Sequence, residues 1–112
     1  MKGKKYLCDS VTIAASKTLS TDPIKTEGLT QLDIYVWNEG TSNACTITIK
    51  GSSTLDAALE RTLAVYTFGA SHKDGDSVEK GYIPRYIWAE IVNEDSLNSA
   101  IVTVQLDSQD WN

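Results

Sequence analysis

Few residues in this chain have the types and spacing that catalysis needs. Its single histidine, His72, stands beside Lys73 and Asp74 in a polar stretch. Acid–base or nucleophilic chemistry needs a base that a third group holds in place, and a histidine in such a stretch is usually solvated. We find no other catalytic motif in the sequence, so we expect no catalytic residues and a protein that is not an enzyme.

Metal ligands are equally sparse. One histidine and two distant cysteines give no zinc-binding spacing. Asp74-Gly75-Asp76 with Glu79 offers the hard oxygen atoms that calcium prefers, and so does Asn93-Glu94-Asp95. Neither stretch has the spacing of an EF-hand loop, and Asp-Gly in a polar stretch is first of all a turn signal. We therefore expect no metal site and no cofactor.

Asp33 and Glu90 form the one carboxylate pair that strand geometry could bring together. A glycosidase would need a cleft between two such groups. The same residues could instead be surface charges that discourage other strands from pairing. We favour this second interpretation.

Cys8 and Cys45 could form one disulfide at most. Each stands among alternating apolar residues, where a free cysteine behaves as a small buried hydrophobic residue. Nothing in the sequence indicates an oxidising compartment. We therefore expect two free thiols, with a bridge as the alternative.

Aromatic residues in predicted strands are the most informative feature. Tyr35 and Trp37 share one face of their strand, and Tyr86 and Trp88 share one face of theirs. If the two strands were neighbours in one sheet, the four rings would form one patch. The patch would either complete the core or be an exposed surface that stacks on sugar rings or anchors a protein partner. These four residues are the candidate binding site.

Period-two alternation predicts the strands that would hold these residues. Leu29–Trp37 alternates aliphatic residues with Asp33, Tyr35 and Trp37, and Ala44–Lys50 alternates apolar residues with Thr and Lys. The intervening residues 38–43, NEGTSN, have turn chemistry, so the two strands are predicted to form a hairpin. The residues predicted to point inward are Leu32, Ile34, Val36, Cys45, Ile47 and Ile49.

A second hairpin is predicted near the C-terminus. Tyr82–Val92 has Pro84 near its start, which suits a strand end or an edge, and continues as a β-branched run. Ala100–Leu106 follows after a turn at residues 93–99. The residues predicted to face the core are Ile87, Ala89, Ile91, Ala100, Val102, Val104 and Leu106.

The rest of the chain completes an all-β pattern. Tyr6–Ala15 gives one or two short strands with a break near Asp9-Ser10, and Thr62–Phe68 gives another strand. Gly69–Gly81 is predicted as a long polar loop, and Thr54–Arg61 as at most one helical turn. Seven or eight short strands favour an antiparallel β-sandwich, Ig-like or jelly-roll-like, with a closed barrel as the alternative.

Composition limits the organisation and the partners. A length of 112 residues predicts one domain, 1–112, with flexible tails at 1–5 and 108–112. The net charge of −5 disfavours nucleic acid, because phosphate backbones need Lys and Arg. There is no apolar run of about 18 residues for a membrane span, and the N-terminus lacks the apolar core of a signal peptide.

From about residue 20 to residue 106, the strand ends resemble those of small β-sandwich accessory proteins of tailed phages and prophages. The stretches that carry the resemblance are DPIKTEGLTQLDIYVWNEGTS, then GSS, then GYIPRYIWAEIVNEDSLNSAIVTVQ. Pro23-Ile24 and Gly28 stand where that group has its extended lead-in. Asn38-Glu39-Gly40 closes a strand, and Asn93 stands at the final turn.

The resemblance implies a structural role and carries over no catalytic residue. It implies capsid decoration, a fibre or a tail component, assembled in the host cytoplasm and located in the virion. The partners would be copies of the chain and other virion proteins such as the major capsid or tail protein. A carbohydrate-binding module that uses the four aromatic residues is the alternative function.

Overall fold

Two antiparallel sheets account for the described part of the chain. The computed structural model describes residues 3–54, 60–68, 72–79 and 83–111, with the backbone alone for residue 68 and residues 72–79. These residues form nine strands: β1 (Gly3–Ile13), β2 (Thr18–Ser20), β3 (Ile24–Lys25), β4 (Gln31–Asn38), β5 (Cys45–Ser52), β6 (Arg61–Phe68), β7 (His72–Glu79), β8 (Tyr86–Asn93) and β9 (Ala100–Ser108).

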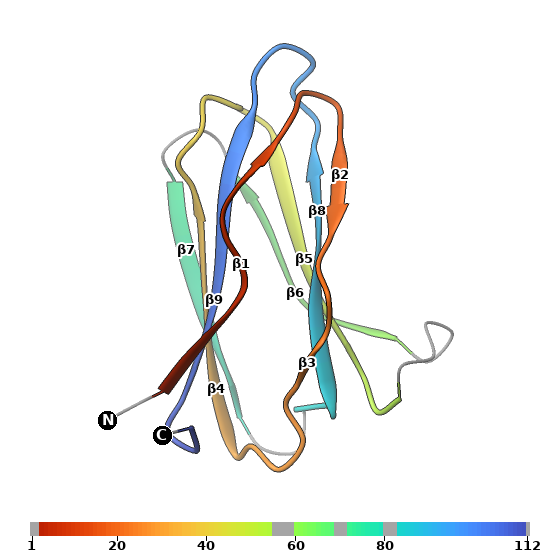
Figure 1. Cartoon of the computed structure of the whole chain (residues 1–112), viewed down its shortest axis with the longest axis vertical. Coiled ribbons are helices and arrows are strands. Elements are labelled where there is room, and N and C mark those ends of the chain that lie inside the picture. The colour runs from red at the N-terminus through yellow and green to blue at the C-terminus, as the bar shows by residue number, and fades with distance from the viewer. Residues whose placement is uncertain (1–2, 55–59, 69–71, 80–82, 112) are drawn as a thin grey trace.

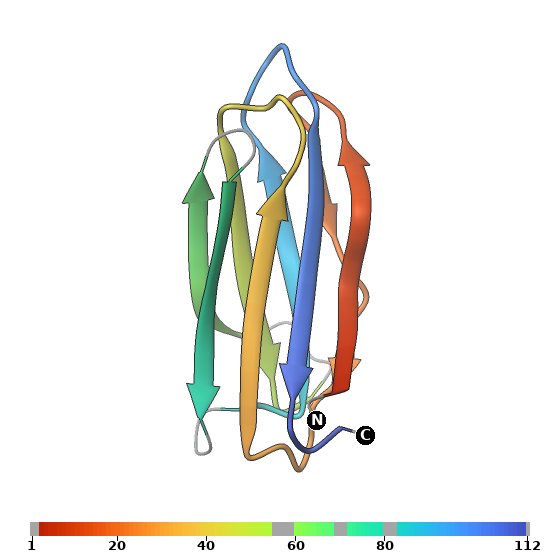
Figure 2. The ribbon, with the colours of Figure 1, turned by 90° about the vertical axis from the view of Figure 1, so that its left-hand side faces the viewer.

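The strands are divided between two layers. Sheet A has the order β1-β9-β4-β7, and sheet B has the order β2-β8-β5-β6, with β3 also paired to β8. Figure 1 shows the two layers from the side, and Figure 2 turns sheet A toward the viewer. The predicted antiparallel β-sandwich is therefore confirmed.

The core lies between the sheets and is built by the predicted alternation. Every second residue of β4, β5, β8 and β9 points inward and is fully buried, because side chains alternate between the two faces of a strand. All the residues predicted to face the core from these strands do so: Leu32, Ile34, Val36, Cys45, Ile47, Ile49, Ile87, Ala89, Ile91, Ala100, Val102, Val104 and Leu106.

Both predicted hairpins are wrong, because each pair of consecutive strands crosses between the sheets. β4 lies in sheet A and β5 in sheet B, and likewise β8 lies in sheet B and β9 in sheet A. The strand neighbours of β4 are β7 and β9, whereas β5 pairs with β6 and β8. A loop of several residues can span the separation of about 10 Å between packed sheets, so turn chemistry did not distinguish the two connections.

The predicted polar loop at Gly69–Gly81 is also wrong over its described part. His72–Glu79 forms β7, which pairs with β4 over its whole length. Its sequence, HKDGDSVE, has little strand propensity, but the open edge of β4 supplies backbone partners that override it. The predicted helical turn at Thr54–Arg61 falls largely on residues 55–59, which lie outside the described residues.

The described parts of the predicted tails belong to the fold. Gly3 to Lys5 begin β1 and pair with the end of β9, where Ser108 is buried. Trp111 packs partly buried against the core, and its carbonyl accepts a 3.0 Å hydrogen bond from the Gly3 amide. The Lys5 ammonium lies 4.8 Å from the centre of the Trp111 ring. The first and last strands therefore hold the two chain ends side by side (Figure 1).

Candidate interaction surface

The four predicted aromatic residues do not form one patch. Tyr35 and Trp37 lie on β4 in sheet A, whereas Tyr86 and Trp88 lie on β8 in sheet B. Each pair alternates with buried core residues of its own strand, so each faces outward from its own sheet. The two pairs are therefore on opposite faces of the sandwich. The same division separates Asp33 of β4 from Glu90 of β8, so these carboxylates do not flank a common cleft.

The outer face of sheet A holds the first pair together. The ring centres of Tyr35 and Trp37 are 6.4 Å apart, and their planes differ by 30°. Tyr35 is 40% exposed, and Trp37 is half-buried. Such an offset pair keeps ring faces accessible and costs little conformational entropy when a partner covers it.

A third aromatic residue joins this face through a bulge in β1. Tyr6 and Tyr35 both lie opposite Gln105 of β9, one on each side of it, and Tyr6 is 41% exposed. The strand register shifts between Tyr6 and Cys8, so Tyr6 points outward while Cys8 points into the core. We define Tyr6, Tyr35, Trp37 and Gln105 as the sheet A platform. Figure 2 shows the sheet that carries it.

Sequence reasoning missed Tyr6 because strict alternation puts it on the same face as Cys8. The predicted break at Asp9-Ser10 corresponds to a second register shift, where Ser10 adopts a φ of 51°. The Ser10 amide donates to Thr103 Oγ1 at 2.9 Å, which ties the bulge to β9. Because this break comes after Cys8, it does not separate Tyr6 from Cys8, and the sequence analysis had no signal for the first register shift.

Polar side chains stiffen the platform's border. Gln31 Nε2 donates to Asp33 Oδ1, and Gln105 Nε2 donates to Asp107 Oδ1, each at 2.6 Å. Asp33 and Asp107 are directly opposite each other on β4 and β9. Each carboxylate thus accepts a hydrogen bond from a carboxamide, which offsets part of the repulsion between two like charges on neighbouring strands.

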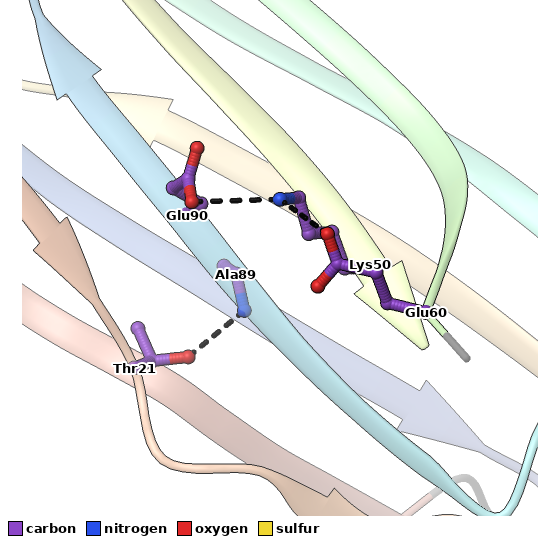
Figure 3. A network of polar contacts seen from close by, with 5 residues as sticks. All are labelled: Thr21, Lys50, Glu60, Ala89 and Glu90. Atoms are coloured by element: carbon purple, nitrogen blue, oxygen red, sulfur yellow. Dashed lines mark hydrogen bonds and ion pairs between the residues drawn. The ribbon is translucent and has the colours of Figure 1, made fainter. Parts of the chain in front are cut away.

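The outer face of sheet B is organised around an ion-pair network (Figure 3). Lys50 Nζ lies 3.1 Å from Glu60 Oε1 and 3.4 Å from Glu90 Oε2. The hydrogen bond to Glu60 is the main cause that raises the pKa of Lys50. Lys50 is also directly opposite Trp88, and Tyr86 is opposite Lys25 of β3. Tyr86 and Trp88 are both half-buried, so this pair gives a less open surface than Tyr35 with Tyr6.

Thr21, the residue after β2, connects this edge of sheet B to β8. The Ala89 amide donates to Thr21 Oγ1 at 2.9 Å (Figure 3), and the Thr21 amide donates to the Ala89 carbonyl at 2.9 Å. This reciprocal pair continues the pairing of β2 with β8 past the end of the strand. It fixes the backbone beside Trp88 and Glu90.

The remaining predictions about chemistry concern the thiols and metal ligands. Cys8 and Cys45 are free and buried, as expected, and burial raises the pKa of each thiol to about 11.

No three His, Cys, Asp or Glu side chains come together as metal ligands among those that the structure describes. The side chains of His72, Asp74, Asp76 and Glu79 lie outside that set. In the described ranges, no helix has the length and apolar character to cross a membrane.

Comparison with known proteins finds similar folds and no sequence relative. No family model and no curated protein matches the chain. The crystal structure of PirA matches with a TM-score of 0.62 and 9% identity, over 92% of this chain and 90% of that one. A Bacillus endospore appendage, described as a disulfide-linked pilus, matches with a TM-score of 0.58 and 9% identity, over 96% and 86%.

A virus structure also contains this sandwich. The infectious bursal disease virus Gx strain matches with a TM-score of 0.53 and 12% identity, over all of this chain and 33% of that chain. The present chain therefore spans about a third of the viral chain. At such identities the likeness shows the fold alone, because one fold hosts many functions.

Proposed function

We propose that this chain is a non-enzymatic structural protein that binds and stabilises a larger assembly through the sheet A platform. The observation that carries the proposal is the pair of exposed tyrosines, Tyr6 and Tyr35, on one sheet face beside Trp37. No described segment of the chain lies over this face (Figure 2). The assembly is a phage particle, with the chain as capsid decoration or as a tail component.

Physical chemistry favours a protein partner for such a face. Tyrosine and tryptophan are frequent anchors of protein interfaces, since they bury a large area with few rotatable bonds. A partner that binds only the folded chain stabilises it by mass action, and the assembled particle gains many such contacts at once. The net charge of −5 suits a partner surface with basic groups around its apolar centre.

The similar structures support a role in assembly. One is described as a pilus and another as a virus, so this sandwich occurs in proteins that form large particles. The phage resemblance of the sequence agrees with that setting. It adds the expectation that the chain acts in the virion as a homo-oligomer beside the major capsid or tail protein.

Carbohydrate binding is the second candidate function, and it would use the same rings. Tyr35 and Trp37 lie side by side at 6.4 Å, a spacing at which two rings can stack on neighbouring sugars. The Gln and Asp side chains along the border would supply hydrogen bonds to hydroxyl groups. Tyr86 and Trp88 do not contribute to this site, because they face the opposite way.

Co-sedimentation with particles of the phage or prophage that encodes the chain tests the proposal. The double variant Tyr6→Ala with Tyr35→Ala should lose particle binding, because it removes both exposed anchors. Tyr86→Ala on the opposite face is the matched control and should bind as the unchanged chain does. Circular dichroism checks that each variant is folded. Equal binding by the double variant and the unchanged chain would refute the platform as the interface.

The carbohydrate alternative has its own measurement. A change in tryptophan fluorescence on adding bacterial polysaccharides, lost in Tyr35→Ala, would favour sugar binding. Binding to deglycosylated particles that is as tight as binding to untreated ones would favour the protein partner.

A further inference from the structure

A sandwich of two open sheets has free strand edges, and each edge exposes backbone groups that another chain can pair with. In the described residues the edge strands are β1 and β7 of sheet A, and β6 and β2 with β3 of sheet B. Proteins that stay separate protect such edges with bulges, prolines, charges or very short strands. The four edges of this chain differ in whether they carry these devices.

Three edges are protected. β1 has two register shifts, and Ser10 bends it with a φ of 51°. β2 and β3 are three and two residues long, and Asp22-Pro23 separates them. The sequence of β7 contains the charged residues Lys73, Asp74, Asp76 and Glu79.

β6 lacks these devices along most of its length. It is eight residues long, and from Thr62 to Phe68 its sequence, TLAVYTF, has no charged residue and no proline. One side of β6 pairs with β5, with a single register shift near its start, and no described strand pairs with its other side. Val65 in its middle is 57% exposed and faces outward. Figure 2 shows β6 at the border of its sheet.

We propose that β6 is a self-association edge, at which β6 of a second copy pairs antiparallel and joins the two B sheets into one. The pattern of the edge points to a second copy as the occupant, because its exposed apolar residue, Val65, lies in the middle of the uncharged stretch, where a two-fold axis matches apolar to apolar. The net charge of −5 opposes contact between copies, and the uncharged stretch from Thr62 to Phe68 adds no like-charge pair at this edge. A two-fold antiparallel pair is also the closed arrangement that most homo-oligomers use.

The side-chain alternation of β6 is compatible with pairing to itself. A two-fold axis at Val65 sets this exposed residue opposite the same residue of the second copy, so the two valines cover each other. The same register sets Ala64 opposite Tyr66. Both residues point inward, since their partners on β5 are the buried Ile49 and Ile47. Every inward residue of this segment thus meets an inward one, as a continuous sheet requires.

This inference rests on the proposed function in one respect: it names how copies of the subunit join in the assembly. The two surfaces are nevertheless separate, because the sheet A platform and the β6 edge belong to different sheets. Tyr35→Ala should impair binding to particles without affecting self-association. Val65→Lys should impair self-association and leave the platform's contact with a particle in place.

Sedimentation equilibrium of the purified full chain over a concentration series tests the edge. The unchanged chain should shift from monomer to dimer mass as concentration rises. Val65→Lys should weaken dimerisation at least about tenfold, because it sets two like charges opposite each other at the axis. Val65→Thr keeps a neutral β-branched residue and should dimerise. Thr48→Lys is the matched control, because Thr48 faces outward directly opposite Val65 but lies one strand inside the edge.

Each result supports or overturns self-association through β6. A chain that stays monomeric at the highest concentration overturns the inference, and so does Val65→Lys protein that dimerises normally. Loss of the dimer in Thr48→Lys with retention in Val65→Lys would show that copies stack face to face instead. Hydrogen exchange gives an independent readout: amides of β6 should become more protected as dimer forms. Loss of protection in every variant would mean that the fold was lost, and circular dichroism detects that directly.

Discussion

The Ser42 hydroxyl donates a 2.7 Å hydrogen bond to Asn93 Oδ1, which joins the loop after β4 to the end of β8 in the opposite sheet. Both side chains are fully buried. The side-chain Nδ2 of Asn93 also donates to the carbonyl of Ile13 at 3.0 Å and to that of Asn98 at 2.9 Å. One side chain thus holds together three of the connections that pass between the sheets, those after β1, β4 and β8.

Asn93→Asp should therefore be among the most destabilising isosteric changes in the chain. The carboxylate cannot donate, so the Ile13 and Asn98 carbonyls each lose a hydrogen bond and a buried charge is added, at a cost of about 3 kcal/mol. Ser42→Ala removes the hydroxyl that donates to Asn93 and accepts a longer, 3.3 Å hydrogen bond from the Ala44 amide, and it should cost about 1 kcal/mol. Urea unfolding of both variants gives the comparison. An Asn93→Asp protein as stable as Ser42→Ala would contradict the role of this amide.

Asp95 makes the stability of the same end depend on pH. The backbone amides of Asn43 and Leu97, and the side chain of Asn98, donate to its carboxylate and lower its pKa from 3.8 to about 2. A lowered pKa in the folded state stabilises the fold above pH 3.8, and this contribution is lost as the pH falls toward 2. The stability gap between the unchanged chain and Asp95→Ala should narrow over that window. A gap that is constant from neutral pH to pH 2 would rule the contribution out.

Gly40 and Gly28 should respond to alanine for different reasons. A Cβ at Gly40 would lie 2.5 Å from the Ser99 carbonyl oxygen and 2.7 Å from the Ile101 nitrogen. Because those neighbours are backbone, Gly40→Ala must move β9 and should cost about 2 kcal/mol.

Gly28 has open space around it, and its φ of +88° is the only obstacle to a side chain. Gly28→Ala should cost about 1 kcal/mol, and Gly28→Asn less, since asparagine tolerates this conformation better. Thermal unfolding of the three variants is the measurement. The order Gly40→Ala, Gly28→Ala, Gly28→Asn, from most to least destabilised, is expected, and any other order would be inconsistent with this explanation.

Cys8 and Cys45 should be unreactive in the folded chain. Burial is the largest cause that raises the pKa of both thiols to about 11, so neither forms a thiolate near neutral pH. A thiol reagent should label both cysteines in denaturant and neither, on the same timescale, without it. Because the pKa is raised on folding, stability should fall as the pH rises from 9.0 toward 11. Rapid labelling of the native chain would show that the core is open.

Most of the fold could be predicted from alternation. In β4 and β8 every second residue, from Leu32 to Val36 and from Ile87 to Ile91, is aliphatic, and aromatic or polar residues stand between them. That periodicity gave the sandwich class and the inward rows that end at Val36 and Ile91. Alternation is local, however, and it says nothing about which strand lies beside which.

Pairing and orientation were decided by the tertiary structure. Whether the chain after β4 formed a hairpin or crossed to the other sheet depended on which strand edges were free to pair. The polar sequence of β7 forms a strand because one edge of β4 was free to pair with it. The predicted site was divided for this reason. The sequence identified Tyr35, Trp37, Tyr86 and Trp88 as aromatic strand residues, but it could not show that their two strands belong to different sheets.

The sequence by itself determined that Tyr35 and Trp37, like Tyr86 and Trp88, lie on the face of their strand opposite the aliphatic row, because side chains alternate along each strand separately. It left open whether those faces are covered. Only the folded chain decided that Tyr6 and Tyr35 share one open face while Trp88 lies on the other. Backbone hydrogen bonds between distant strands set that arrangement, and one register shift in β1 turned Tyr6 outward.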